Sequence, residues 1–110
     1  MLQVFDDGKI ALTRGDTAWL TVSVTNDTGA AYEIQNGDTL TLSLKKSVKD
    51  ADIVMSKTVV GTDTFHIKPE DTAELAFRKY VYDVQLTTFD RDVFTVVPPS
   101  TFEILSEVTV

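Results

Sequence analysis

Apolar and polar residues alternate with a period of two along much of the chain, a pattern typical of β-strands that place one face on a core. The alternation is clearest over residues 17–25, 39–45, 65–67 and 80–86. These four segments are predicted to be half-buried strands.

Weaker strands are predicted where β-branched residues gather, over residues 9–13, 53–60, 93–97 and 102–108. Turn-forming residues separate the strands at short intervals, among them Pro98-Pro99. One helical turn is predicted over 69–75, because Pro69 suits the first position of a helix and acidic residues follow it. About eight short strands in 110 residues favour a single all-β sandwich domain over residues 1–110.

The charge of the chain limits its partners. Seventeen acidic residues against ten basic ones give a net charge of −7, and the basic residues are scattered. A nucleic acid or an anionic membrane is bound by clustered Lys and Arg, so neither is expected as a partner. The start of the chain lacks the basic and apolar regions of a signal peptide, and the absence of cysteine fits a reducing cytoplasm.

Catalysis is not expected. Without cysteine, nucleophilic chemistry would depend on the one histidine, His66, whose neighbours Phe65 and Ile67 occupy core-facing positions of a strand. His66 is therefore predicted to point to solvent. No catalytic residue, cofactor or metal ligand is predicted.

Four further segments have simple turn interpretations. The acidic loops 50–52 and 90–92 could offer oxygens to calcium, but they lack the remaining ligand pattern, and Asp is a favoured turn residue. Arg14-Gly15-Asp16 spells an integrin-binding tripeptide and Asn26-Asp27-Thr28 a glycosylation sequon. Each lies where a turn is needed, so neither function is expected.

Three aromatic residues are candidates for an interface: Trp19, Phe89 and Phe94. Alternation sends Trp19 away from the core-facing residues of its strand, and the two phenylalanines flank the turn at 90–92. Exposed aromatic side chains often mark contact surfaces. Trp19 could instead cover an open end of the core. In an alternative function, as a carbohydrate-binding module, Trp19 or Tyr32 would stack on a sugar ring.

The segment 70–75 followed by 80–86 resembles the E–F corner of immunoglobulin-type domains, where a helical turn precedes a Tyr-bearing strand. Tyr80 and Tyr82 are the two candidates for the corner tyrosine. This resemblance implies an immunoglobulin-like sandwich of two antiparallel sheets with about seven or eight strands.

Most of the chain also resembles small β-sandwich proteins of Gram-positive prophages, which are similar to the N-terminal domains of phage baseplate upper proteins. The segments that carry this resemblance are 10–17, 37–40, 80–86, 95–97 and 102–104. It implies a non-catalytic accessory protein of a phage tail or baseplate, present in the bacterial cytoplasm during assembly and then in the virion. Its partners would be other protein subunits, in a homo-oligomer or the virion assembly. The end of the chain, residues 106–110, is a candidate edge strand for such pairing.

Overall fold

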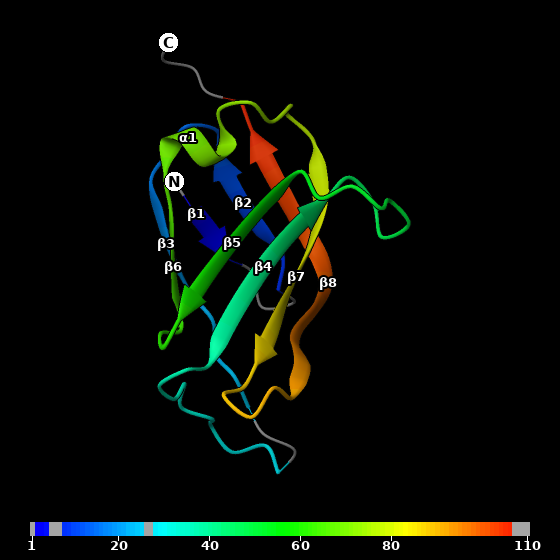
Figure 1. Cartoon of the computed structure of the whole chain (residues 1–110). Helices are drawn as coiled ribbons and strands as arrows, with labels where there is room; N and C mark the ends of the chain where they lie inside the picture. Colours follow the sequence, from blue (N-terminus) through cyan, green and yellow to red (C-terminus); the bar gives the residue numbers. More distant parts are fainter. Residues whose placement is uncertain (1, 5–7, 26–27, 107–110) are drawn as a thin grey trace.

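The computed structural model of the chain describes residues 2–4, 8–25 and 28–106, with side chains from residue 8 onward. It contains eight strands and one helical turn within these residues (Figure 1). The elements are β1 (Leu2–Val4), β2 (Ile10–Thr13), β3 (Ala18–Thr21), β4 (Thr39–Lys45), β5 (Met55–Val60), β6 (Thr64–Ile67), α1 (Pro69–Thr72), β7 (Lys79–Thr87) and β8 (Val93–Leu105). The predicted all-β fold and the helical turn are confirmed, whereas β1 was not predicted.

The strands form a six-stranded sheet in the order β1-β2-β8-β7-β4-β5 and a two-stranded sheet of β3 and β6. All neighbouring strands are antiparallel except β2 and β8, which are parallel. The large sheet is therefore mixed, and the prediction of wholly antiparallel sheets is wrong. Parallel neighbours need a long crossover connection, and the chain between β2 and β8 provides it.

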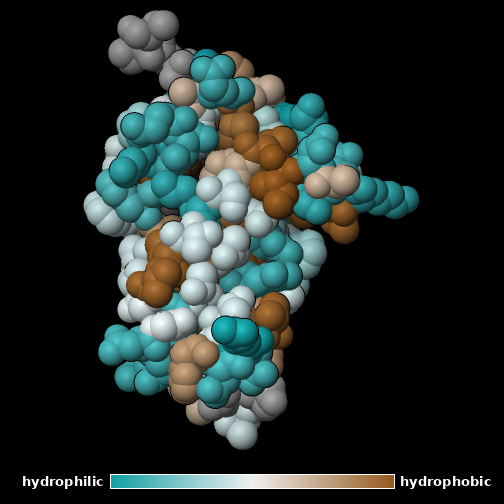
Figure 2. All heavy atoms as spheres, viewed as in Figure 1, coloured by the Kyte–Doolittle hydropathy of each residue, from teal (hydrophilic) through white to brown (hydrophobic). Residues whose placement is uncertain are grey.

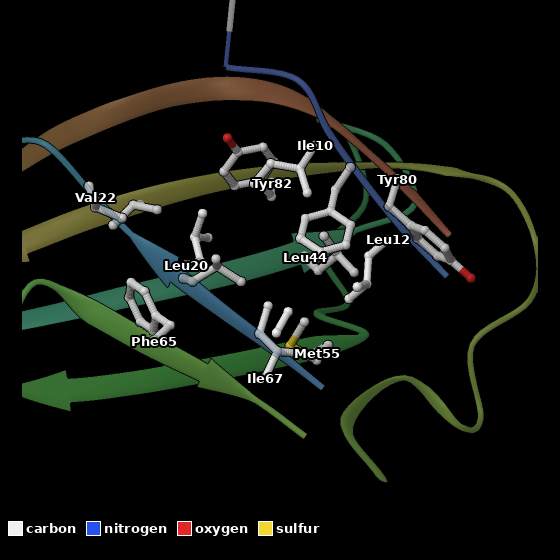
Figure 3. Packing of buried hydrophobic residues seen from close by; sticks show 14 of the residues in the cluster. Ile10, Leu12, Leu20, Val22, Leu44, Met55, Phe65, Ile67, Tyr80 and Tyr82 are labelled. Atoms are coloured by element: carbon white, nitrogen blue, oxygen red, sulfur yellow. The ribbon is translucent and has the colours of Figure 1, made fainter. Parts of the chain in front are cut away.

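The core lies between the two sheets. Every second residue of β4 is fully buried, and the same alternation holds in β6 and β7. Figure 3 shows Leu20 of β3 and Phe65 of β6 in the same packed layer as Leu44 and Tyr82 of the large sheet. The period-two pattern thus identified the core-facing side of these strands correctly.

The two strands predicted over 93–97 and 102–108 form a single strand in the structure. Instead of a turn at Pro98-Pro99, β8 runs without interruption from Val93 to Leu105. The pairing with β7 shifts there, because Val84 pairs with Val97 but Tyr82 pairs with Ser100. Proline has no N–H for the ladder, and this bulge accommodates the two prolines within a continuous strand.

Residue 106, the first of the candidate edge strand 106–110, directly follows β8 and is not part of a strand. β8 lies between β2 and β7, but β2 pairs only with Phe102–Leu105 at its C-terminal end. Residues 107–110 lie outside the described residues.

The predicted strand 17–25 is regular only over β3. Beyond it, Val22 and Val24 stay buried, but their backbones pair with different segments. The Val22 N–H donates to the Asp63 carbonyl at 2.9 Å, and the Tyr32 N–H donates to the Val24 carbonyl at 2.8 Å. The side-chain alternation therefore extends further than the regular strand.

The corner between α1 and β7 contains the hydrogen bond expected of a tyrosine corner. The Tyr80 hydroxyl donates to the carbonyl oxygen of Ala76 at 3.0 Å, four residues upstream, as in a tyrosine corner. The other candidate, Tyr82, donates instead to the Gly8 carbonyl. Tyr80 is thus the corner residue, and Tyr82 ties the segment before β2 to the sheet.

Candidate functional site

The turn of the β7–β8 hairpin lies at the end of the sandwich opposite α1 (Figure 1). The Arg91 N–H donates to the Thr88 carbonyl at 2.8 Å, and the Thr88 N–H donates to the Asp92 carbonyl at 2.8 Å. Arg91 has a positive φ of 70°, which is typical of the residue that closes such a hairpin turn. The turn presents Phe89, whose side chain is 61% exposed.

A buried carboxylate, Asp38, holds this end of the molecule together. Its Oδ2 accepts hydrogen bonds from the Tyr32 hydroxyl at 2.6 Å and the Gln35 N–H at 2.9 Å. Its Oδ1 accepts one from the Phe89 N–H at 3.0 Å. The backbone carbonyl of Asp38 accepts a further bond from the Gly61 N–H at 2.8 Å. One residue therefore links three loops.

The charge state of Asp38 follows from these contacts. Burial opposes ionisation, but the hydrogen bonds from Tyr32, Gln35 and Phe89 outweigh it and hold the pKa of Asp38 below its ordinary value. The same hydrogen bond raises the pKa of Tyr32, with smaller contributions from desolvation and from the charges of Asp38 and Asp90. The pair is thus a carboxylate and a neutral phenol at neutral pH.

Gly37 allows Phe89 to approach this carboxylate. Its φ is +89°, which glycine adopts without steric cost. A Cβ added at this position would lie 3.2 Å from the Cβ of Phe89, closer than ordinary contact. Gly37 therefore meets both a backbone and a packing requirement at the hairpin turn.

Beside the turn is a groove of about 370 Å³, which we call the hairpin groove. It is lined by Val24, Thr25, Tyr32, Leu86, Thr88, Phe94, Thr95 and Val96. Phe94 pairs with the buried Leu86 and faces the same side of the sheet, yet it is 50% exposed. The regular part of β3 ends at Thr21, so the smaller sheet does not extend over this end of β8.

The structure brings two of the three predicted interface residues together. Phe89 and Phe94 belong to one hairpin, and Phe94 lines the hairpin groove. Trp19 lies on β3, in the smaller sheet, and is not among the groove residues. Figure 2 shows apolar surface on the viewed face only as separate patches among polar side chains.

Trp19 is 64% exposed, so the alternative in which it covers the core is wrong. Its ring stacks on His66 at a centroid distance of 3.8 Å and an interplanar angle of 7°. His66 lies between the fully buried Phe65 and Ile67, which confirms its predicted outward direction. Trp19 and His66 thus form an aromatic pair on the outer face of the smaller sheet.

The turn interpretation of Arg14-Gly15-Asp16 agrees with its contacts. The Gly15 N–H donates to the hydroxyl of the buried Thr72, and the Arg14 guanidinium lies 4.1 Å from the ring centre of Phe77. Arg14 therefore packs on the corner near α1 instead of extending into solvent. Asn26-Asp27 lies outside the described residues.

No group of three or more His, Cys, Asp or Glu side chains is arranged to hold a metal ion among the residues that the structure describes. In the same residues, no helix has the length and apolar character needed to cross a membrane.

Sequence reasoning missed Asp38 and the groove. Asp38 lies in a Gly-Asp-Thr turn that resembles the one at Gly15-Asp16-Thr17, so its composition alone indicated only a turn. A comparison of the sequence with protein-family models and with curated proteins finds no match.

Proposed function

We propose that the chain is a non-catalytic interaction module that binds a partner protein at the hairpin groove. The observation that carries this proposal is Phe94, an inward-facing aromatic residue that is half exposed beside an apolar groove. Aromatic side chains in such positions contribute strongly to binding, because a partner removes their large apolar area from water.

The groove is suited to binding because its walls are fixed before a partner arrives. Asp38 joins Tyr32 of one wall to the hairpin that carries the other. A preformed site loses less conformational entropy on binding. Its volume is at the lower end of the roughly 300–1,000 Å³ of small-molecule sites, which fits one or two apolar side chains of a protein.

Charge defines the partner further. Exposed Asp90 and Asp92 lie in the hairpin turn with one base, Arg91, and exposed Glu33 follows Tyr32. The whole chain carries a net charge of −7. Complementary charge favours a partner segment in which an apolar anchor is flanked by Lys or Arg.

The finer proposal places the module in a phage tail or baseplate. It is supported by the resemblance to prophage β-sandwich proteins over residues 10–17, 37–40, 80–86, 95–97 and 102–104. Mass spectrometry of purified virions from the encoding genome tests it. We expect the chain among the structural proteins, and its absence from intact virions would contradict this assignment.

What supports a non-catalytic role is the environment of the single imidazole. The His66 ring is stacked on Trp19 in the smaller sheet, whereas the buried carboxylate Asp38 serves the loops around the hairpin. Each of these groups already has a structural partner.

Peptide selection tests the groove. Displayed peptides would be selected on the wild type, and their affinity compared for Phe94→Ser and for Phe77→Ser, a phenylalanine of similar exposure near α1. We expect peptides with an apolar anchor and basic flanks, about 100-fold weaker on Phe94→Ser and unchanged on Phe77→Ser. Equal binding to all three proteins would contradict the proposal.

Carbohydrate binding is a second candidate, favoured by the exposure of Trp19 on a flat aromatic pair. Aromatic rings present an apolar face on which a sugar could stack. Glycan-array binding that Trp19→Ala abolishes and Phe94→Ser leaves intact would support it over the groove. Absence of glycan binding by the wild type would contradict it.

A further inference from the structure

Among the residues that the structure describes, the smaller sheet has an open edge along β3. There β3 pairs with β6 alone, and the Val22–Asp63 hydrogen bond extends the same register. In an antiparallel ladder, residues alternate between those that bond to the neighbouring strand and those whose backbone groups point away. Since Val22 bonds toward Asp63, the N–H and C=O groups of Trp19, Thr21 and Ser23 point to the open edge.

The sequence of this edge strand contains none of the residues that usually protect an edge against further pairing. Natural edge strands are protected by charged residues, Pro, bulges or inward-pointing charges. The nine residues Thr17–Thr25 contain no charged residue, no Pro and no Gly, although the chain as a whole is strongly acidic. Trp19, Thr21 and Ser23 are all exposed.

The edge strand β5 shows the contrast. Lys57 pairs with the core-facing Leu42, so it points to the inner side of the sheet, where its Nζ lies 2.8 Å from the carboxylate of Asp71. A strand added beyond β5 would bury this ion pair further, which is unfavourable. The edges along β3 and β5 are therefore not equivalent, and of these two β3 is better suited to accept a strand.

We propose that β3 pairs, antiparallel, with β3 of a second copy of the chain across a two-fold axis at Thr21. This proposal goes beyond the binding role proposed for the hairpin groove, because it identifies a second contact, along β3, whose partner is the chain itself. In this register Thr21 faces Thr21 of the second copy, and Trp19 faces Ser23 of the second copy. The backbone groups that point to the open edge then bond to one another.

In this register the side chains of the two copies are complementary. On the inner side, Leu20 meets Val22 of the second copy, so the two apolar cores become continuous. On the outer side, the large Trp19 lies beside the small Ser23 of the second copy. The pairing is isologous and closed, as in most homodimers, and it joins two acidic chains along their charge-free segments.

Disulfide trapping tests the register, because the chain has no cysteine of its own. Directly opposite residues in such a ladder have Cα atoms about 5.5 Å apart, within the range of a disulfide. Thr58 is the matched control, since it is an exposed threonine on β5 that contacts Thr41 as Thr21 contacts Thr64. We expect Thr21→Cys to form a covalent dimer under mild oxidation and Thr58→Cys to remain monomeric. Equal dimer yields from the two variants would overturn the register.

Sedimentation equilibrium tests the dimer itself. We expect the wild type to dimerise, Thr21→Lys to weaken dimerisation on the order of 100-fold because two like charges meet at the axis, and Thr58→Lys to have no effect. Circular dichroism establishes that both variants fold. A wild type that stays monomeric at about 1 mM overturns the proposal. The groove would still bind its selected peptides in that case, so a failure of the dimer and a failure of the proposed function give different results.

Discussion

The two ends of the sandwich share one structural device, a buried polar side chain that accepts backbone N–H groups, but their exposed phenylalanines lie in different surroundings. Near α1, the buried Thr72 hydroxyl accepts the Gly15 N–H, and the Arg14 guanidinium lies over Phe77. At the hairpin end, Asp38 accepts three hydrogen bonds, and Phe94 lines an apolar groove. Phe77 and Phe94 are 48% and 50% exposed, respectively.

This contrast shows that exposure alone does not identify a binding residue. Phe77 already has a cationic partner from its own chain. Phe94 lines the hairpin groove, whose walls are held in place by the buried carboxylate of Asp38. The end near α1 is thus a structural corner, and the hairpin end is the one suited to a partner.

The largest loss of stability is expected when the Asp38 carboxylate at the hairpin end is removed. Asp38→Ala leaves three donors without their acceptor, and we expect the free energy of unfolding to fall by about 3 kcal/mol or more. Asp38→Asn keeps one side-chain oxygen as a hydrogen-bond acceptor, so we expect a smaller fall in the free energy of unfolding. Urea denaturation measures both. Full stability of Asp38→Ala would show that the three hydrogen bonds do not hold the hairpin end.

The sequence predicts the strands of this molecule better than the contacts between its loops. The alternation of Leu40, Leu42 and Leu44 predicts a half-buried strand, because a regular strand repeats every two residues. Asp38 has no such repeat, since its three donors come from positions 32, 35 and 89. Contacts between distant loops depend on the folded chain, so the groove could not be predicted.

The same limit explains the error at Pro98-Pro99. Two consecutive prolines usually end a strand, and the sequence alone does not show that a bulge opposite β7 accommodates them. For the candidate site, the sequence indicated Phe89 and Phe94 through their flanking turn. It could not show that Trp19 lies apart from them.

A smaller loss of stability is expected from a substitution at the α1 end. Thr72→Val preserves side-chain shape but removes the acceptor of the Gly15 N–H, so we expect a loss of about 1–2 kcal/mol in the free energy of unfolding. Thr72→Ser is the control, since it retains the hydroxyl. Peptide binding at the hairpin groove should be unchanged in both. Impaired binding would show that the two ends are coupled.

Acidification weakens the carboxylate contacts at both ends of the sandwich. Burial opposes ionisation of Asp71 as well, but Lys57 and the Lys68 N–H lower its pKa, as the hairpin contacts lower the pKa of Asp38. Both contributions to stability are present above the ordinary pKa of about 3.9 and are lost as the pH falls through the lower folded pKa. We expect Asp38→Asn to lose less stability than the wild type between about pH 5 and pH 2. Identical pH profiles would contradict a depressed pKa for Asp38.

The smallest stability effect is expected for the exposed phenylalanines. Phe77→Ser removes the contact with Arg14 and should cost about 0.5–1 kcal/mol. Phe94→Ser should cost a similar amount or less, because half of its side chain is already in water. Thermal unfolding checks both variants. A large loss in Phe94→Ser would identify Phe94 as a structural residue.

Site-specific photo-crosslinking tests the central claim most directly. A photoreactive phenylalanine analogue would be placed at position 94 or at position 77 in the full chain, during assembly with its partner proteins or with the selected peptides. We predict a defined crosslinked product from position 94 and none from position 77, which has similar exposure at the opposite end. Equal crosslinking from both positions, or crosslinking from position 77 alone, would contradict the assignment of binding to the hairpin groove.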